Sequence, residues 1–368
     1  MVRILHIHSN VNIQSGVMSV IMNYYRNIDT NHMQFDFLYY VPQSSDTLTN
    51  EETIRNLGGR VFFIKKTFHM FHDIERFLQE HRGEFQVLHL HNAFLARFLY
   101  KKAKRAGIRL FITHAHGTCW SDHFLNGLRN RLSCINLHKY TDVCFACSKL
   151  AGEFIYGANA SFYVINNAID TDKYSFDFDL RMRLRKKYNL QEKFVLGHVG
   201  RMAYPKNPLF ILDIFKEAKK RIPNAVLLYA GDGVLQNEII CHTKKLDLED
   251  SVLFLGNCQN ANELYNVMDV FLLPSLYEGL PVVGVEAQCN SLPIIMSTAI
   301  TNEVVIFQYR YISLENEATY WSKNLIDLAE NSVRNKEDAL VAIRKNGFDI
   351  KVEGKRLENL YNELLEEY

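Results

Sequence analysis

The sequence predicts an α/β protein with two Rossmann-like parallel-sheet domains facing a cleft. Its 368 residues exceed what one compact core usually holds and suit two domains of roughly 180 residues. Short β-rich runs recur along the chain, and each is followed by a helical stretch. Most of these runs are continuously apolar, as strands buried on both faces are. This alternation is typical of parallel strands joined by right-handed crossovers.

The expected strands form one sheet in each half of the chain. In the first half they cover residues 3–9, 35–41, 60–65, 87–91, 110–116, 142–148 and 163–169, and in the second half 194–200, 225–231, 252–256, 270–275, 292–297 and 311–315. A polar stretch without a strand separates the two halves. We therefore expect an N-terminal domain over residues 1–172, a linker over 173–190, a C-terminal domain over 191–346 and a final charged helix over 347–368.

The composition excludes several classes of protein. Lys and Arg number 42 against 41 Asp and Glu, so the net charge of +1 lacks the basic excess of a dedicated nucleic-acid binder. No window approaches the roughly eighteen consecutive apolar residues of a spanning helix, and the N-terminus runs into a strand pattern without a signal-peptide layout. The seven cysteines form no dense framework, which favours reduced thiols and a cytoplasmic protein.

The most informative segment covers residues 274–287, where a buried strand ends in a glycine-containing turn and Pro281 occupies the first turn of a helix. The amides around Gly279 and Leu280 should point beyond the strand ends, with the positive end of the helix dipole behind them, which suits phosphate. Glu278 and Glu286 are at most about 12 Å apart along that helix. This span suits one carboxylate at each end of a nucleotide-diphospho-sugar. The alternative is that both are solvated acids at a helix end.

A second strand ends at Gly200 and leads into a loop that carries Arg201 and Lys206. Two fixed cations there can neutralise a diphosphate, the arginine as a fork and the lysine as a point charge. Loop cations are more often plain surface charges. Near the end of another expected strand, backbone groups at Gly256 and Asn257 are candidates for reading a nucleotide base, either uracil or guanine.

Three His-x-His pairs lie on expected strands of the first half, and alternate residues on a strand share a face. A metal site is disfavoured, because no carboxylate or cysteine is spaced to complete one. The outer histidine of each pair should emerge at a strand end, and His116, which is followed by a loop, is the best candidate for substrate contact. The pairs are His6 and His8, His89 and His91, and His114 and His116.

Several weaker features remain. Gly16, after the first strand at the start of a helix, permits close approach to a phosphate or sugar. No GxGxxG fingerprint follows a strand, which argues against a nicotinamide dehydrogenase. Asp-x-Asp pairs at residues 170–172 and 177–179 are more typical of solvated turns than of a metal-dependent transferase. The basic run 181–187 could contact anionic lipid headgroups, although such a run is more often a solvated helix face.

Taken in this order, the segments resemble the retaining, GT-B-fold glycosyltransferases of family 4, most closely the enzymes that build bacterial capsular or exopolysaccharide. The resemblance covers nearly the whole chain. The motifs that carry it are Phe145-Ala-Cys-Ser-Lys-Leu-Ala151, Val164-Ile-Asn-Asn-Ala-Ile-Asp170, Gly200-Arg201 with Lys206-Asn207, Glu278 and Glu286 with seven residues between them, and the glycine loop at Gly16.

The resemblance implies a role for each of the charged residues named above. Arg201 and Lys206 would bind the donor diphosphate. Glu278, with the amides that follow it, would hold the transferred sugar, and Glu286 would bind the ribose. His116 would contact the sugar from the N-terminal domain and help the reaction.

The resemblance also implies that Gly16 belongs to a glycine-rich loop near the donor and that the final helix crosses back to the N-terminal domain. Ser15 stands where the family commonly has a second glycine, so the donor contacts of that loop stay open. Because Arg201 and Lys206 can offset the charge of a leaving diphosphate, we expect no metal and no other cofactor.

The expected function is transfer of a hexose from a nucleotide diphosphate sugar, most simply a UDP-sugar, to a glycan or lipid-linked acceptor in cell-surface polysaccharide synthesis. The expected partners are that donor, that acceptor and the inner surface of the membrane, but no nucleic acid.

The nearest alternative is a UDP-N-acetylglucosamine 2-epimerase on the same fold, which needs acid/base carboxylates that no N-terminal strand end offers. A glycoside hydrolase is disfavoured because its two carboxylates lie about 5 to 9.5 Å apart across the bond, whereas Glu278 and Glu286 are expected farther apart and on one element. A non-catalytic sugar-binding protein is disfavoured because it would not need a phosphate clamp.

Overall fold

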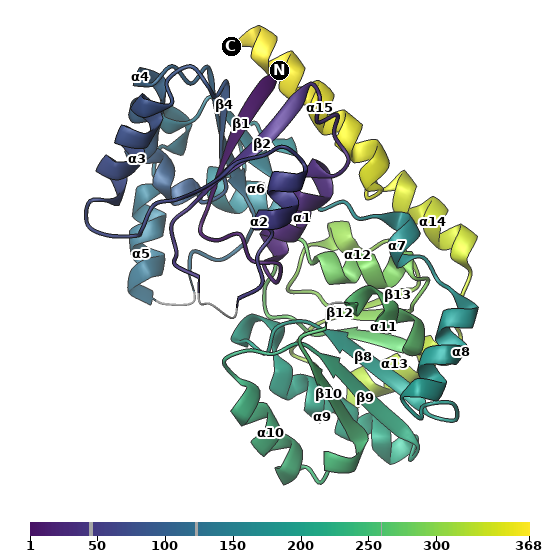
Figure 1. Cartoon of the computed structure of the whole chain (residues 1–368). Coiled ribbons are helices and arrows are strands. Elements are labelled where there is room, and N and C mark those ends of the chain that lie inside the picture. Colours follow the sequence, from purple (N-terminus) through teal and green to yellow (C-terminus); the bar gives the residue numbers. More distant parts are fainter. Residues whose placement is uncertain (44–46, 122–123, 259) are drawn as a thin grey trace. The chain divides into compact units, whose positions relative to one another are not determined.

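The computed structural model describes residues 1–43, 47–121, 124–258 and 260–368, and the chain forms two compact units (Figure 1). The first unit comprises residues 1–168 and 350–368, and the second comprises residues 169–349. Each unit contains one parallel sheet with helices, which confirms the expected α/β fold class with two Rossmann-like sheets.

In the described part of the first unit, the parallel strands lie in the order β3-β2-β1-β4-β5-β6-β7. The order reverses between β1 and β4, which is the switch point of a doubly wound sheet. The strands are β1 (Val2–His8), β2 (Met33–Tyr39), β3 (Val61–Phe63), β4 (Val87–Leu90), β5 (Leu110–Ala115), β6 (Val143–Ala146) and β7 (Tyr163–Val164). The helices are α1 (Gly16–Tyr25), α2 (Glu51–Asn56), α3 (Met70–Glu80), α4 (Ala96–Arg105), α5 (Phe124–Ser133), α6 (Lys149–Tyr156) and α15 (Ile350–Glu367).

The second unit repeats this plan, with its described strands in the order β10-β9-β8-β11-β12-β13 and its switch point between β8 and β11. The strands are β8 (Phe194–Val199), β9 (Ala225–Ala230), β10 (Val252–Gly256), β11 (Val270–Leu273), β12 (Ile294–Ser297) and β13 (Tyr309–Ile312). The helices are α7 (Thr171–Tyr174), α8 (Phe178–Lys187), α9 (Pro208–Arg221), α10 (Gln236–Lys245), α11 (Ala261–Val267), α12 (Val282–Cys289), α13 (Ala318–Glu330) and α14 (Lys336–Lys345).

The unit boundaries differ from the expected domain boundaries. The units meet at 168/169 and 349/350, so the stretch 173–190 that we expected to be a linker lies inside the second unit. It does so because it forms α7 and α8, which pack against α11. The two Asp-x-Asp pairs start these helices: Asp170, just before this stretch, and Asp177, within it, are their N-caps.

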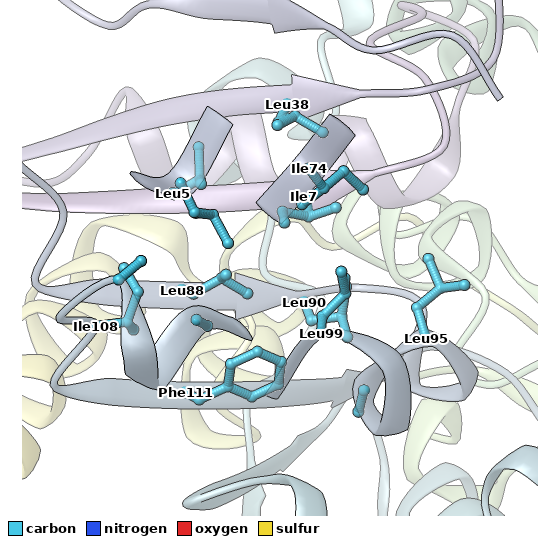
Figure 2. Close-up of a cluster of buried hydrophobic side chains, with 14 of the residues drawn as sticks. Leu5, Ile7, Leu38, Ile74, Leu88, Leu90, Leu95, Leu99, Ile108 and Phe111 are labelled. Atoms are coloured by element: carbon cyan, nitrogen blue, oxygen red, sulfur yellow. The ribbon is translucent and has the colours of Figure 1, made fainter. Parts of the chain in front are cut away.

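The central strands of the first unit separate two kinds of side chain. Figure 2 shows the apolar face, where Leu5 and Ile7 of β1 and Leu88 and Leu90 of β4 lie among buried side chains that include Ile74 from α3. Because successive residues of a strand point to opposite faces, the residues between them point to the other face. Those residues are His6 on β1 and His89 on β4, and His8, two positions after His6, points to the same face.

The last helix, α15, belongs to the first unit and packs against α1. Contact is close at Gly354, where an added Cβ would lie 2.8 Å from the Asn27 carbonyl oxygen. Farther along α15, Tyr361 is fully buried, and its hydroxyl reaches Nδ1 of His89 at 2.6 Å. The end of the chain therefore covers the histidine side of the first sheet.

The basic run 181–187 lies on α8 and is partly committed to internal contacts. Arg181 donates to the Met268 carbonyl at 2.9 Å, and Arg185 donates to the Asp269 carboxylate at 2.9 Å. Asp269 also accepts the Val195 amide at 2.8 Å, so α8 is clamped to β8 and to the start of β11. These two arginines are therefore not available to a lipid surface. Within the described residues, no helix is both long and apolar enough to cross a membrane.

Candidate active site

The candidate site of the second unit lies at the switch point of its sheet, between β8 and β11. The carboxyl ends of parallel strands share one edge of a sheet, and open α/β sheets bind ligands beyond that edge where the strand order reverses. Residues 200–207 follow β8, and residues 274–281 follow β11. Both loops carry residues that the sequence predicts to bind a donor.

An ion pair joins the two loops. Nζ of Lys206 donates to Oε2 of Glu278 at 2.7 Å, and the two side chains are only 17% and 14% exposed. The Ser275 hydroxyl donates to the other Glu278 oxygen at 2.6 Å. The backbones are joined as well, because the Leu276 amide donates to the Pro205 carbonyl at 2.8 Å. The structure thus brings together two of the predicted residues, Lys206 and Glu278.

A third loop, residues 231–235 after β9, packs against the first. The Met202 amide donates to the Asp232 carbonyl at 2.7 Å. At Gly231 φ is +138°, and an added Cβ would lie 2.0 Å from the Gly200 carbonyl oxygen. Only glycine fits there, because a side chain would collide with backbone. The loop that carries Lys206 is therefore held from both sides.

Helix α12 begins at Val282 beside the ion pair. Pro281 is its N-cap and not, as predicted, a residue of its first turn, and no side chain of the described residues caps the helix. The first N–H groups of a helix have no partner within it, and together with the helix dipole they favour an anion. Gly279 and Leu280 lie in the turn before α12. This is the position that the sequence predicts for an anion, and the role of the turn stays a prediction.

Glu286, on α12, is oriented by two tyrosines. The Tyr265 hydroxyl donates to its carboxylate at 2.6 Å, and Tyr174 forms a second hydrogen bond with it. Burial raises the pKa of Glu286, while both hydrogen bonds and the charges of Lys173 and Lys206 oppose the rise. Glu286 is therefore not a solvated acid at a helix end. Sequence reasoning missed both tyrosines, because only the packing of α7 and α11 against α12 brings them there.

Two predicted donor-binding residues of this unit stand apart from the ion pair. Arg201 is exposed, and its side chain forms no hydrogen bond or ion pair with the described residues. Asn257, just beyond β10, is also exposed. The structure leaves both side chains accessible, and their roles stay predictions.

The remaining predicted residues lie in the first unit. Gly16 is the first residue of α1, which is capped by the hydroxyl of Ser15 accepting from the Met18 amide at 3.4 Å. A Cβ added to Gly16 would meet no described atom within 4 Å, so the fold itself does not require glycine there. His116 follows β5, is half-buried, and contacts Nδ1 of His91 through its Nε2 at 2.8 Å.

The His-x-His pairs are closer to one another than the sequence indicated. In two trios, possible ligand atoms all lie within 4.8 Å of one another: His6, His89 and His91, and His91, His114 and His116. The sequence argument sought a completing carboxylate or cysteine and missed that a neighbouring strand supplies a third imidazole. Proximity alone does not make a metal site, because the ligand lone pairs must also converge on one point.

We predict that Tyr265→Phe raises the pKa of Glu286 further. The tyrosine hydroxyl stabilises the charged carboxylate, so its loss favours the protonated form. The measurement is a carboxyl-carbon NMR titration of Glu286. Tyr229→Phe is the control, since the Tyr229 hydroxyl is buried in the same unit and has no partner among the described residues. An equal titration midpoint in Tyr265→Phe and the unmodified protein would contradict the assignment.

Comparisons with known proteins show the family to which this chain belongs. Residues 181–347 match the family described as Glycosyl transferases group 1. A Bacillus subtilis protein named as a glycosyltransferase, EpsF, is 30% identical over 98% of this chain and 96% of its own. The UDP-Gal:alpha-D-GlcNAc-diphosphoundecaprenol alpha-1,3-galactosyltransferase of Escherichia coli is 26% identical over 73% of this chain and 67% of its own.

Among solved structures, HepE of Anabaena in complex with UDP and glucose has a TM-score of 0.81, at 14% identity, over 98% of this chain and 100% of its own. That likeness shows the fold alone. The match to EpsF extends over both units, and the family match covers most of the second. The chain therefore belongs to the group 1 glycosyltransferases, and it is a glycosyltransferase with the GT-B fold.

Proposed function

We propose that this protein is a retaining hexosyltransferase that moves a hexose from a UDP-sugar to a lipid-linked glycan acceptor in cell-surface polysaccharide synthesis. The observation that carries the proposal is the Lys206–Glu278 ion pair at the switch point of the second sheet, beside the start of α12. The name of the Escherichia coli relative specifies a UDP-sugar donor and a diphosphoundecaprenol acceptor. A solved structure of HepE contains UDP-glucose. Both support the choice of donor, and the first supports a lipid carrier.

Lys206 supplies fixed positive charge for the donor diphosphate. Its ammonium group has three N–H donors, and the contact with Glu278 uses one of them, so the others can serve phosphate oxygens. Arg201 adds a guanidinium group from the same loop, and α12 adds the positive end of its dipole. In this arrangement Glu278 and the amides after it hold the sugar, and Glu286 holds the ribose.

The reaction replaces the bond from the anomeric carbon to the phosphate oxygen by a bond to the acceptor hydroxyl on the same face of the sugar. The hydroxyl proton passes to the departing phosphate oxygen, so the products are the glycoside and UDP. Negative charge develops on the leaving diphosphate, and fixed positive groups aimed at that charge lower the barrier. Lys206 and Arg201 take this role, and no enzyme carboxylate acts as a nucleophile.

The direct test is a transfer assay with UDP- and GDP-linked hexoses and a polyprenyl-diphosphate-linked sugar as acceptor. We expect turnover with a UDP-sugar and a first-formed product whose anomeric configuration, read by NMR, equals that of the donor. An inverted product would contradict the retaining mechanism. Conversion of UDP-N-acetylglucosamine without acceptor would instead identify an epimerase.

We predict that Glu286→Ala chiefly weakens UDP binding, whereas Glu278→Ala chiefly lowers kcat. The ribose does not change during the reaction, whereas the sugar does. Loss of a charged hydrogen bond to the ribose should cost about 1.5–3 kcal/mol, a loss of affinity of roughly tenfold or more. Calorimetric titration with UDP and steady-state kinetics separate the two effects. Glu238→Ala, on the exposed face of α10, is the control. Unchanged UDP affinity in Glu286→Ala would refute the ribose assignment.

We propose that catalysis needs no divalent metal, because Lys206, Arg201 and the start of α12 supply the positive charge that a metal would supply elsewhere. The initial rate of metal-stripped enzyme should therefore be the same with and without EDTA. Arg201→Ala should lower that rate more than chelation does. Activity that disappears with EDTA and returns with manganese or magnesium would overturn this proposal.

We also propose that the enzyme works in the cytoplasm, in peripheral contact with the inner surface of the membrane, and that α5 makes this contact. Phe124 and Leu125 are 84% and 78% exposed, and further exposed leucines follow along the helix. Arg129 and Arg131 are exposed on the same helix, whose ten residues include no Asp or Glu. Apolar side chains flanked by cations suit an anionic lipid surface.

Vesicle sedimentation tests this contact. The protein should bind phosphatidylglycerol vesicles more strongly than phosphatidylcholine vesicles, and salt should weaken the binding. The double variant Phe124→Ser with Leu125→Ser should lose at least tenfold in affinity, since burying each side chain contributes about 1.5–3 kcal/mol. Val341→Ser, an exposed apolar position of the second unit, is the control. Equal binding by all three proteins would show that α5 does not touch the lipid.

A further inference from the structure

One face of the first sheet is lined by histidines, and the proposed function uses only one of them, His116. Six imidazoles lie there on three adjacent strands or directly after them, and His6 of β1 stands directly opposite His89 of β4 in the register. Five of the rings are buried, and only His116 is partly exposed. The six are His6, His8, His89, His91, His114 and His116.

Three of these rings form one hydrogen-bonded chain. Nδ1 of His6 lies 2.9 Å from Nε2 of His91, and Nδ1 of His91 lies 2.8 Å from Nε2 of His116. The corresponding ring centres are 5.2 and 5.0 Å apart, with the planes inclined by only 14° and 32°. Because the centres are so much farther apart than the bonded nitrogens, the rings lie edge to edge. The chain runs from the buried His6 to the accessible His116.

A second chain lies against the first. Nε2 of His89 is 3.0 Å from Nδ1 of His114, and the other end of His89 meets Tyr361 of α15. The two chains stack face to face: the ring centres of His89 and His91 are 4.4 Å apart at 16°, and those of His114 and His116 are 4.0 Å apart at 27°. The lone pair of an imidazole nitrogen lies in the plane of its ring, so the lone pairs of stacked rings lie in separate planes and do not converge on one point. The rings are therefore arranged for hydrogen bonds to one another and not for one shared metal ion.

The rings of the first chain are neutral. Burial lowers the pKa of His6 to about 3, and burial together with neighbouring histidines lowers the pKa of His91 and His116 well below the ordinary value. A neutral imidazole has one N–H donor and one lone pair, so each ring of a chain donates in one direction and accepts from the other. The proton position of one ring therefore fixes that of the next.

The buried end of the chain selects its direction. Nε2 of His6 is buried and has no partner among the described residues. If the N–H groups of the chain were all on Nε2, that atom would be a buried donor without an acceptor, which folded proteins avoid more strictly than an unused acceptor. If they are all on Nδ1, His6 donates to His91 and His91 donates to His116. The Nδ1–H of His116, which has no partner among the described residues, then points out of the chain.

We propose that His91, itself oriented by His6, is a positioning residue that holds His116 as its Nδ1–H tautomer. His116 then presents a hydrogen-bond donor, and not a base, to its ligand. The role in sugar transfer rests on the proposed function, whereas the tautomer does not. A donor at this position cannot take the acceptor proton, which is consistent with the departing phosphate oxygen receiving it.

The test is nitrogen NMR of protein labelled with 15N-histidine, in which protonated and unprotonated ring nitrogens have distinct shifts. The His116 signals are identified by their loss in His116→Gln. We expect a protonated Nδ1 and an unprotonated Nε2 at neutral pH. A protonated Nε2, or a doubly protonated ring, in the unmodified enzyme would overturn the proposal without the need for any further variant.

Two matched variants test the part played by His91. His91→Phe keeps an aromatic ring but removes the donor to His116, so His116 should populate both tautomers and kcat should fall about tenfold with the KM for the donor unchanged. His114→Phe keeps the ring that stacks on His116 and should leave the His116 tautomer as it is. An unchanged tautomer in His91→Phe, or a changed tautomer with unchanged kcat, would refute the positioning role. If His116 gives the expected spectrum but the protein turns over no UDP-sugar, the proposed function is refuted and the tautomer assignment stands.

Discussion

The ion pair between Lys206 and Glu278 is the interaction on which the candidate site depends. It joins the loops that leave β8 and β11 at the one place in the second sheet where the strand order reverses. Both side chains are largely buried, so removing either would leave the other charge uncompensated, which is costly in proteins. The same loops are tied by the bond from Leu276 to Pro205 and packed on Gly231. A charged group is thereby held at fixed position before any ligand arrives, and such preorganisation is what an electrostatic site requires.

The two units differ in the polarity of their candidate site residues. The second offers charge: a lysine, two carboxylates and the start of a helix. The first offers neutral imidazoles, whose pKa values are lowered by burial, for example to about 3 in His114. The alternation of side chains along β1 and β4 makes this arrangement possible, because apolar side chains fill one face (Figure 2), while histidines lie on the other. The hydrogen bond between Tyr361 and His89 ties that face to the last helix of the chain.

Much of the fold was predictable because buried parallel strands are short, continuous apolar runs with few alternatives. Each expected run contains or overlaps a strand, although β7 is much shorter than expected and β13 begins two residues earlier. The linker was misplaced because α8 is polar along most of its length and is held by Arg185 on Asp269, a contact across 84 positions of sequence that no local pattern indicates. Two further features could not be predicted for the same reason, because both arise from tertiary packing. They are the tyrosines around Glu286 and the hydrogen bonds between histidines of different pairs.

We propose that Lys206 binds the diphosphate of the donor at the switch point of the second sheet. Calorimetric titration of the unmodified enzyme and of Lys206→Gln with UDP and with uridine tests it most directly. Lys206→Gln should lose at least about tenfold in affinity for UDP, the effect of one charged hydrogen bond, and keep its affinity for uridine. Equal UDP affinity in the two proteins, or an equal loss for UDP and uridine, would contradict it.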